Sequence, residues 1–120
     1  MPEEPHALGE VIAERGVTFT RADGSTEQVT IRIGKPTTGE FPDEWTCPYQ
    51  IQGFGRTKTF RAAGVDSIQA LLLTLQTILP ELDHLAKRES ASYCWLEIAN
   101  AGFPDYRLSP SYQKGQRRGA

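Results

Sequence analysis

The chain has 120 residues, of which 38% are hydrophobic and 23% charged, and its formal net charge is −2. This length predicts one domain with a single core that needs neither disulfides nor a metal, and no apolar run approaches the roughly 20 residues of a membrane span. The charge is uneven: residues 1–44 hold nine acidic and four basic side chains, or −5, which leaves +3 for the remainder. Because a nucleic-acid-binding domain normally presents a basic face, this balance argues against that class for the domain as a whole.

Both ends of the chain are poor in side chains that could pack. We predict a flexible N-terminal arm over residues 1–10, a single folded domain over 11–99 and a flexible basic tail over 100–120. The N-terminus carries three glutamates but no basic start and no apolar stretch, so it does not resemble a secretory signal. We therefore expect a cytoplasmic protein.

The first half of the domain alternates apolar and polar residues, which predicts strands. A first strand runs from Val11, with a bulge expected at Arg15 and Gly16. Asp23 and Gly24 predict a hairpin turn with positive φ at both positions, followed by a return strand over Glu27–Ile33. Residues 34–44 are rich in Gly, Pro and acids and predict a long surface loop.

Two further strands are expected, over 45–52 and from about Thr57 to Ala62. Pro48 lacks a backbone donor, so the earlier of the two is predicted to be an edge strand or to begin its pairing after a bulge. The pair of glycines in the connection between them, Gly53 and Gly55, predicts a hairpin turn, since a nucleotide-binding loop needs a third glycine and a helix directly after it.

A long amphipathic helix is the strongest local pattern in the sequence. Between Asp66 and Arg88, apolar residues recur at helical spacing and predict one buried face: Ile68, Leu71, Leu72, Leu75, Ile78, Leu79, Leu82, Leu85 and Ala86. Asp66 or Ser67 is expected to cap its start, and Pro80 to kink or break it. Tyr93–Ile98 then predicts a strand, central in the sheet because both of its faces carry bulky side chains.

Together these elements predict an α+β fold. We expect a mostly antiparallel sheet of about five strands, in the order strand, strand, strand, strand, helix, strand. One long, Pro-kinked amphipathic helix is expected to cover one face of this sheet.

The sequence offers little catalytic chemistry. Cys47 and Cys94 are each flanked by large apolar or aromatic residues and are expected to be buried reduced thiols. A cysteine nucleophile would need a neighbouring base, and His6 and His84 are distant from each other in the sequence and too few to form a metal site with the cysteines. We predict no catalytic residues, no metal and no cofactor, and a binding protein rather than an enzyme.

Two clusters remain as candidate binding sites. The acidic loop combines carboxylates with aromatic anchors and predicts a protein-binding edge for a basic partner, formed by Glu40, Phe41, Asp43, Glu44 and Trp45. The alternative is that its aromatic side chains pack into the core. The second cluster, formed by Phe54, Arg56, Lys58 and Arg61, could bind a small ligand or nucleic acid, although such a basic strand is also typical of a solvated face.

Four segments carry a resemblance to known sequences: Val11-Ile12-Ala13-Glu14-Arg15, Val29-Thr30-Ile31-Arg32-Ile33-Gly34-Lys35-Pro36, Trp45-Thr46-Cys47-Pro48-Tyr49-Gln50-Ile51 and Gly64-Val65-Asp66-Ser67-Ile68-Gln69-Ala70-Leu71. In this succession the chain resembles a family of small uncharacterised bacterial proteins from about Val11 to Ile98. The resemblance implies a bacterial cytoplasmic origin and brings no activity or site residues.

Small acidic α+β domains without catalytic residues are similar to immunity proteins and other inhibitors. We therefore expect a protein-binding module that neutralises a toxin or regulates an enzyme. The alternative is a small-ligand or nucleic-acid-binding domain that uses Arg56, Lys58 and Arg61.

Overall fold

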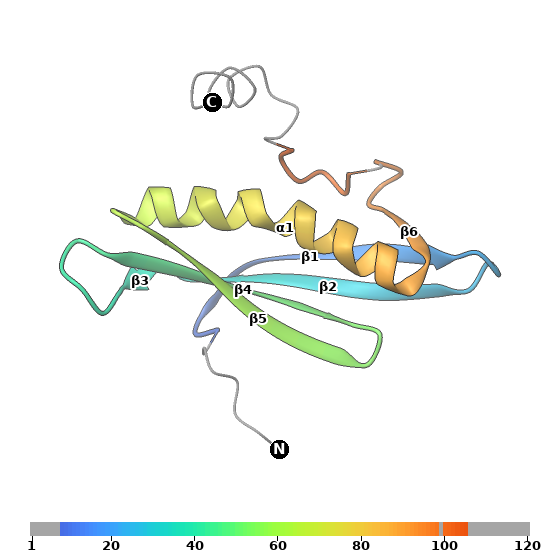
Figure 1. The fold of residues 1–120 in the computed structure, drawn as a ribbon, viewed down its shortest axis with the longest axis horizontal. Coiled ribbons are helices and arrows are strands. Elements are labelled where there is room, and N and C mark those ends of the chain that lie inside the picture. Colours follow the sequence, from blue (N-terminus) through green and yellow to red (C-terminus); the bar gives the residue numbers. More distant parts are fainter. Residues whose placement is uncertain (1–7, 99, 106–120) are drawn as a thin grey trace.

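The computed structural model describes residues 8–98 and 100–105 and shows an antiparallel sheet with one helix packed on it (Figure 1). Its elements, in chain order, are β1 (Val11–Arg21), β2 (Thr26–Gly34), β3 (Thr37–Thr38), β4 (Trp45–Gly53), β5 (Arg56–Gly64), α1 (Ser67–Glu89) and β6 (Ala91–Cys94). The predicted α+β class is confirmed. The two-residue strand β3 is the element that the sequence did not predict, because it lies within the segment 34–44 that was interpreted as a loop.

β4 lies inside the sheet, so the prediction of an edge strand was wrong. β5 pairs with the whole of β4, from Trp45 to Gly53, while β2 and β3 share the other side of the strand. The β2 ladder reaches Tyr49 and the β3 ladder begins at Thr46, which leaves Pro48 in the interval between them. On that side the missing N–H of Pro48 interrupts neither ladder.

The β1–β2 hairpin differs from its prediction at two points. The register shifts near Ile12, between Val11 and Ala13, whereas Gly16 pairs regularly with Thr30. The bulge therefore lies at the start of β1. In the turn, Gly24 has a positive φ of 89° and donates its N–H to the carbonyl of Arg21. This is a longer turn with one left-handed glycine rather than a two-residue turn with two.

The core lies between α1 and one face of the sheet. The sheet contributes Val17, Phe19, Val29, Ile31, Ile33, Cys47, Tyr49 and Ile51, and the helix contributes Ala70, Thr74, Ile78, Leu79, Leu82 and Leu85. The opposite face is polar and hydrogen-bonded within itself: Arg32 reaches Glu14 at 2.7 Å and Gln52 at 2.6 Å. The fold is therefore two layers, with a solvated outer sheet face.

α1 is continuous from Ser67 to Glu89 and runs through Pro80 without a break. Of the two residues predicted to cap the helix, Asp66 is the N-cap, because its side chain accepts a hydrogen bond from the N–H of Gln69 at 2.8 Å. The predicted buried face was too wide. Ile68 and Leu72 are 67% and 43% exposed, so they lie outside the face of α1 that contacts the sheet.

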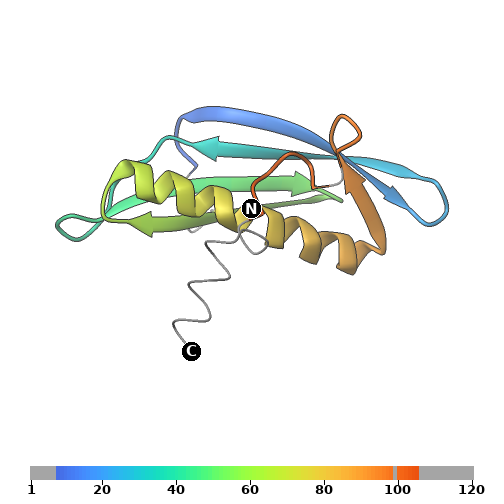
Figure 2. The ribbon, with the colours of Figure 1, turned by 90° about the horizontal axis from the view of Figure 1, so that it is seen from above.

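The last strand is shorter than predicted and lies at the edge of the sheet, where β6 pairs only with β1 (Figure 2). Leu96 and Glu97 then form a turn with positive φ. The segment after this turn packs on the sheet, since Ala101 and Phe103 are buried and Arg15 donates a hydrogen bond to the Ala101 carbonyl at 3.1 Å. The predicted flexible tail therefore does not begin at residue 100, while residues 106–120 and the arm before residue 8 lie outside the described part.

Candidate functional site

The acidic loop between β3 and β4 is a compact turn held by one of its own carboxylates. The Glu44 side chain accepts hydrogen bonds from the N–H groups of Glu40 and Phe41, at 3.0 and 3.4 Å. The backbone closes the same turn, because Gly39 donates its N–H to the Glu44 carbonyl at 2.6 Å. Glu44 therefore shapes the loop, while Glu40 and Asp43 remain on its exposed surface.

The two aromatic residues of this loop have different surroundings. Phe41 is 64% exposed at the loop, whereas Trp45 is partly buried and packs against the core. The alternative interpretation, that the aromatic side chains pack into the core, is therefore right for Trp45 and wrong for Phe41.

The start of α1 adds three more exposed apolar side chains at this end of the molecule. The loop and the first turns of the helix lie at the same end in both views (Figures 1 and 2). At Gly64, which pairs with Trp45, a Cβ atom would lie 2.6 Å from the backbone nitrogen of Ala70, so the chain reverses tightly from β5 into the helix. Val65 and Ile68 are each 67% exposed, and Leu72 follows Ile68 by one helical turn.

We call this region the end surface and define it by Glu40, Phe41, Asp43, Val65, Ile68 and Leu72. The two segments that form it carry acidic but no basic side chains, because the sequence has no Lys or Arg from Pro36 to Trp45, or from Ala62 to Ala86. The three helix-side residues were missed as surface residues because their spacing is that of a buried face. The available signal was the width of the apolar stripe, which exceeds what one sheet face can cover.

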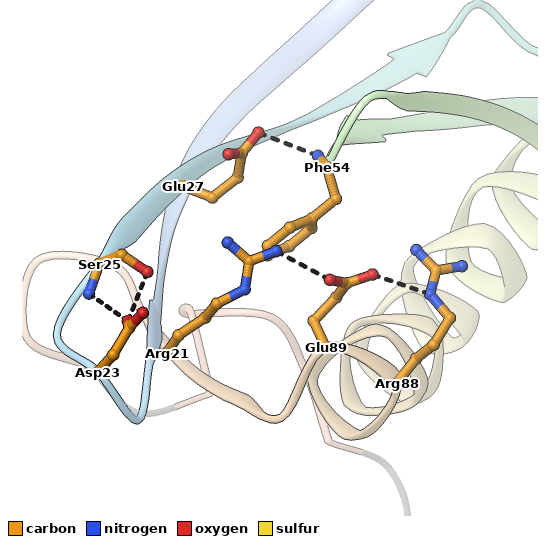
Figure 3. A network of polar contacts seen from close by, with 7 residues as sticks. All are labelled: Arg21, Asp23, Ser25, Glu27, Phe54, Arg88 and Glu89. Carbon is orange, nitrogen blue, oxygen red and sulfur yellow. Dashed lines mark hydrogen bonds and ion pairs between the residues drawn. The ribbon is translucent and has the colours of Figure 1, made fainter.

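The second predicted site is divided by the structure. Phe54 packs edge-on against Phe19, with ring centroids 5.6 Å apart, and the Arg21 guanidinium lies 4.7 Å from its ring centroid. Figure 3 shows how Arg21 also pairs with Glu89 at 3.0 Å. Phe54 is therefore part of the contact between the β1–β2 hairpin and the end of α1.

The carboxylate of Glu89 joins two cations in this contact. Arg88 lies 3.2 Å from the second oxygen of Glu89, on the other side from Arg21 (Figure 3). These hydrogen bonds lower the pKa of Glu89 below its usual value. In the hairpin turn, hydrogen bonds from the backbone and side chain of Ser25 likewise lower the pKa of Asp23.

The basic residues of β5 lie on two faces of the sheet. Because side chains alternate along a strand, Arg56 and Lys58 share the helix side with Phe60, while Arg61 lies on the outer face. Arg56 and Lys58 line a cleft of about 380 Å³ together with Glu81, His84 and Arg88 of α1. The helix residues of this cleft were not predicted, although their spacing of three and four residues is the signal that places them on one helix face.

The two cysteines lie in different surroundings. Cys47 is buried, its thiol contacts the Gly34 carbonyl at 3.5 Å, and burial raises its pKa, so the thiolate is disfavoured. Cys94 is exposed, contrary to the prediction, and no disulfide joins the two. Within residues 8–98 and 100–105, no group of three or more His, Cys, Asp or Glu side chains is placed to hold a metal ion. No helix in this part of the chain has both the length and the apolar character needed to span a membrane.

Comparison with known proteins gives one match. No curated protein and no solved structure matches the chain. A family model described as a domain of unknown function, DUF6968, matches residues 13–105, which include β1 from Ala13 onward, all the later strands, the helix and the packed segment after β6. The chain belongs to this family, the domain of unknown function DUF6968.

Proposed function

We propose that this protein is a non-enzymatic protein-binding module and that the end surface contacts a basic protein partner. The observation that carries the proposal is that exposed apolar side chains occur at one end of the molecule: Phe41, which lies with the exposed Glu40 and Asp43 in the β3–β4 loop, and Val65, Ile68 and Leu72 around the start of α1. Contiguous exposed apolar side chains rimmed by polar groups are typical of protein interaction sites.

The residue types at the end surface match what such sites require. A phenylalanine and three aliphatic side chains supply apolar burial, which provides most of the affinity of a protein interface. The carboxylates can attract and orient a positively charged partner, and the surrounding segments carry no basic residue to oppose it. This combination supports a basic partner over an acidic one.

The biological role that fits such a module is that of an immunity protein or inhibitor, which acts by covering its target. In this proposal the protein neutralises a basic toxin or regulates an enzyme in a bacterial cytoplasm. The alternative function, binding of a small ligand, is supported by a different region of the molecule, the cleft lined by Arg56 and Lys58.

The proposal is tested by co-purification of the tagged full-length protein from its native cells, with three variants measured in parallel. We expect one stoichiometric basic partner with the wild type, lost on Phe41→Ser and on Ile68→Gln. Leu96→Asn is the matched control, because Leu96 is also an exposed apolar residue, at 74%, but lies in the turn after β6 and is not part of the end surface.

Replacement of Phe41 or Ile68 is expected to weaken binding by about 10- to 30-fold, the usual effect of truncating a central apolar contact. Because the replaced side chains are exposed, the free energy of unfolding of each variant should lie within about 0.5 kcal/mol of that of the wild type. Equal recovery of the partner by Ile68→Gln and Leu96→Asn would show that the end surface does not bind it. Recovery of a partner with an acidic binding face would also contradict the proposal.

A further inference from the structure

The cleft between β5 and the second half of α1 combines an apolar floor with a basic rim. Ile51, Phe60 and Leu85 supply apolar side chains, and Arg56, Lys58 and Arg88 supply positive charges. Its volume of about 380 Å³ is within the range typical of small-molecule sites. The cleft is separate from the end surface, because none of the residues that define that surface lines it.

Three residues of β5 line the same side of the cleft. Arg56, Lys58 and Phe60 occupy alternate positions of one strand and so share a face. The Phe60 ring stacks on Tyr49 with centroids 4.9 Å apart and an interplanar angle of 16°, which fixes its orientation. The Lys58 ammonium lies 5.4 Å from the Phe60 centroid, so charge and aromatic surface occur side by side.

The charges of the cleft are not balanced. Three lining residues carry a full positive charge, and Glu81 is the one acidic lining residue, which leaves +2 with His84 neutral. Arg88 is partly compensated by Glu89, at 3.2 Å. Within the described part of the chain, Arg56 and Lys58 form no ion pair with any carboxylate. Clustered cations beside a low-dielectric wall attract anions.

We propose that this cleft binds a small soluble organic anion that carries an apolar body. The anionic group would pair with Arg56 and Lys58, and the body would cover Phe60 and the aliphatic floor. A nucleic acid strand is a poorer fit, because it needs a continuous basic track. Arg61, the next cation along β5, lies on the opposite face of the sheet and does not extend such a track.

The test is a fluorescence titration of the full-length protein with 8-anilinonaphthalene-1-sulfonate, an aromatic sulfonate, at low salt. We expect saturable one-to-one binding. Lys58→Met and Arg56→Gln each replace a cation with a shorter, uncharged side chain, and each should weaken binding at least fivefold. Arg61→Gln is the matched control on the same strand and should change the dissociation constant less than twofold.

A second probe and a competitor complete the test. N-phenyl-1-naphthylamine, a neutral analogue, should bind at least tenfold more weakly, and phosphatidylglycerol vesicles should not displace the sulfonate from the protein. The proposal is overturned if the neutral probe binds equally well or if Arg61→Gln weakens binding as much as Lys58→Met. It is also overturned if vesicles displace the probe, since the basic rim would then serve a membrane surface. Loss of binding on Ile68→Gln would place the probe at the end surface and contradict the cleft site.

Discussion

Thr74 provides a sharp test of how α1 is attached to the sheet. Its hydroxyl is fully buried and donates a hydrogen bond to the Cys47 carbonyl at 2.7 Å. Cys47 pairs with Ala62 of β5 and, on the other side of β4, lies between the β2 and β3 ladders, so this bond ties the helix to the inner strand β4. Thr74→Val keeps the shape of the side chain and removes the donor. The loss of a neutral hydrogen bond costs about 0.5–1.5 kcal/mol, and a buried carbonyl left without it costs about 1–3 kcal/mol.

We therefore expect Thr74→Val to lower the free energy of unfolding by about 1–2 kcal/mol, which corresponds to a fall of roughly 4–8 °C in Tm for a domain of this size. The measurement is urea unfolding followed by circular dichroism. Thr77→Val is the matched control, because Thr77 is an exposed threonine of the same helix that bonds the Thr74 carbonyl one turn earlier and the Tyr49 hydroxyl, but no backbone carbonyl of the sheet. If the two variants differ by less than about 0.3 kcal/mol, the hydrogen bond to Cys47 does not hold the helix on the sheet.

Three further predictions concern other parts of the structure. Arg15→Met removes a guanidinium that lies 3.7 Å from the Trp95 ring centroid and donates a hydrogen bond to the Ala101 carbonyl. The free energy of unfolding should therefore fall by about 1–2 kcal/mol, and amide hydrogen exchange at Ala101 should accelerate. Burial raises the pKa of Tyr49 to about 12, whereas the pKa of a tyrosine in the unfolded chain is about 10. Because Tyr49 therefore loses its proton more readily in the unfolded chain, the free energy of unfolding should fall as the pH rises from 10 to 12. The resulting loss, about 2–3 kcal/mol in urea unfolding, should be absent in Tyr49→Phe. Glu44→Gln should destabilise the β3–β4 loop and raise amide exchange at Phe41, and unchanged exchange there would contradict the role given to this carboxylate.

The fold class could be predicted because local patterns determine it. Alternation over β1, β2 and β4 and the helical stripe of α1 each require one buried face, and a sheet with one helix satisfies them together. The position of β4 could not be read in the same way. Pro48 forbids one backbone bond, but only the pairing of β2 and β3 along the same side shows that this bond is not needed.

The candidate sites were predicted less completely, for a related reason. The spacing of Ile68 and Leu72 is that of a buried face, and whether they are covered depends on how far the sheet extends beneath them. The basic cluster of β5 was identified by composition. Strand alternation explains why this cluster is divided between two faces of the sheet. His84 and Arg88 line the cleft because α1 passes over β5, and no local sequence pattern indicates that path.

The central claim is that the end surface contacts a protein partner, and photo-crosslinking in the native cells tests it most directly. A benzophenone amino acid placed at position 41 should yield one discrete adduct with a basic protein after illumination, whereas the same group at position 96 should not. Phe41 and Leu96 are suited to the comparison because both are more than half exposed, at 64% and 74%. Absence of an adduct at position 41, or the same adduct from both positions, would contradict the account.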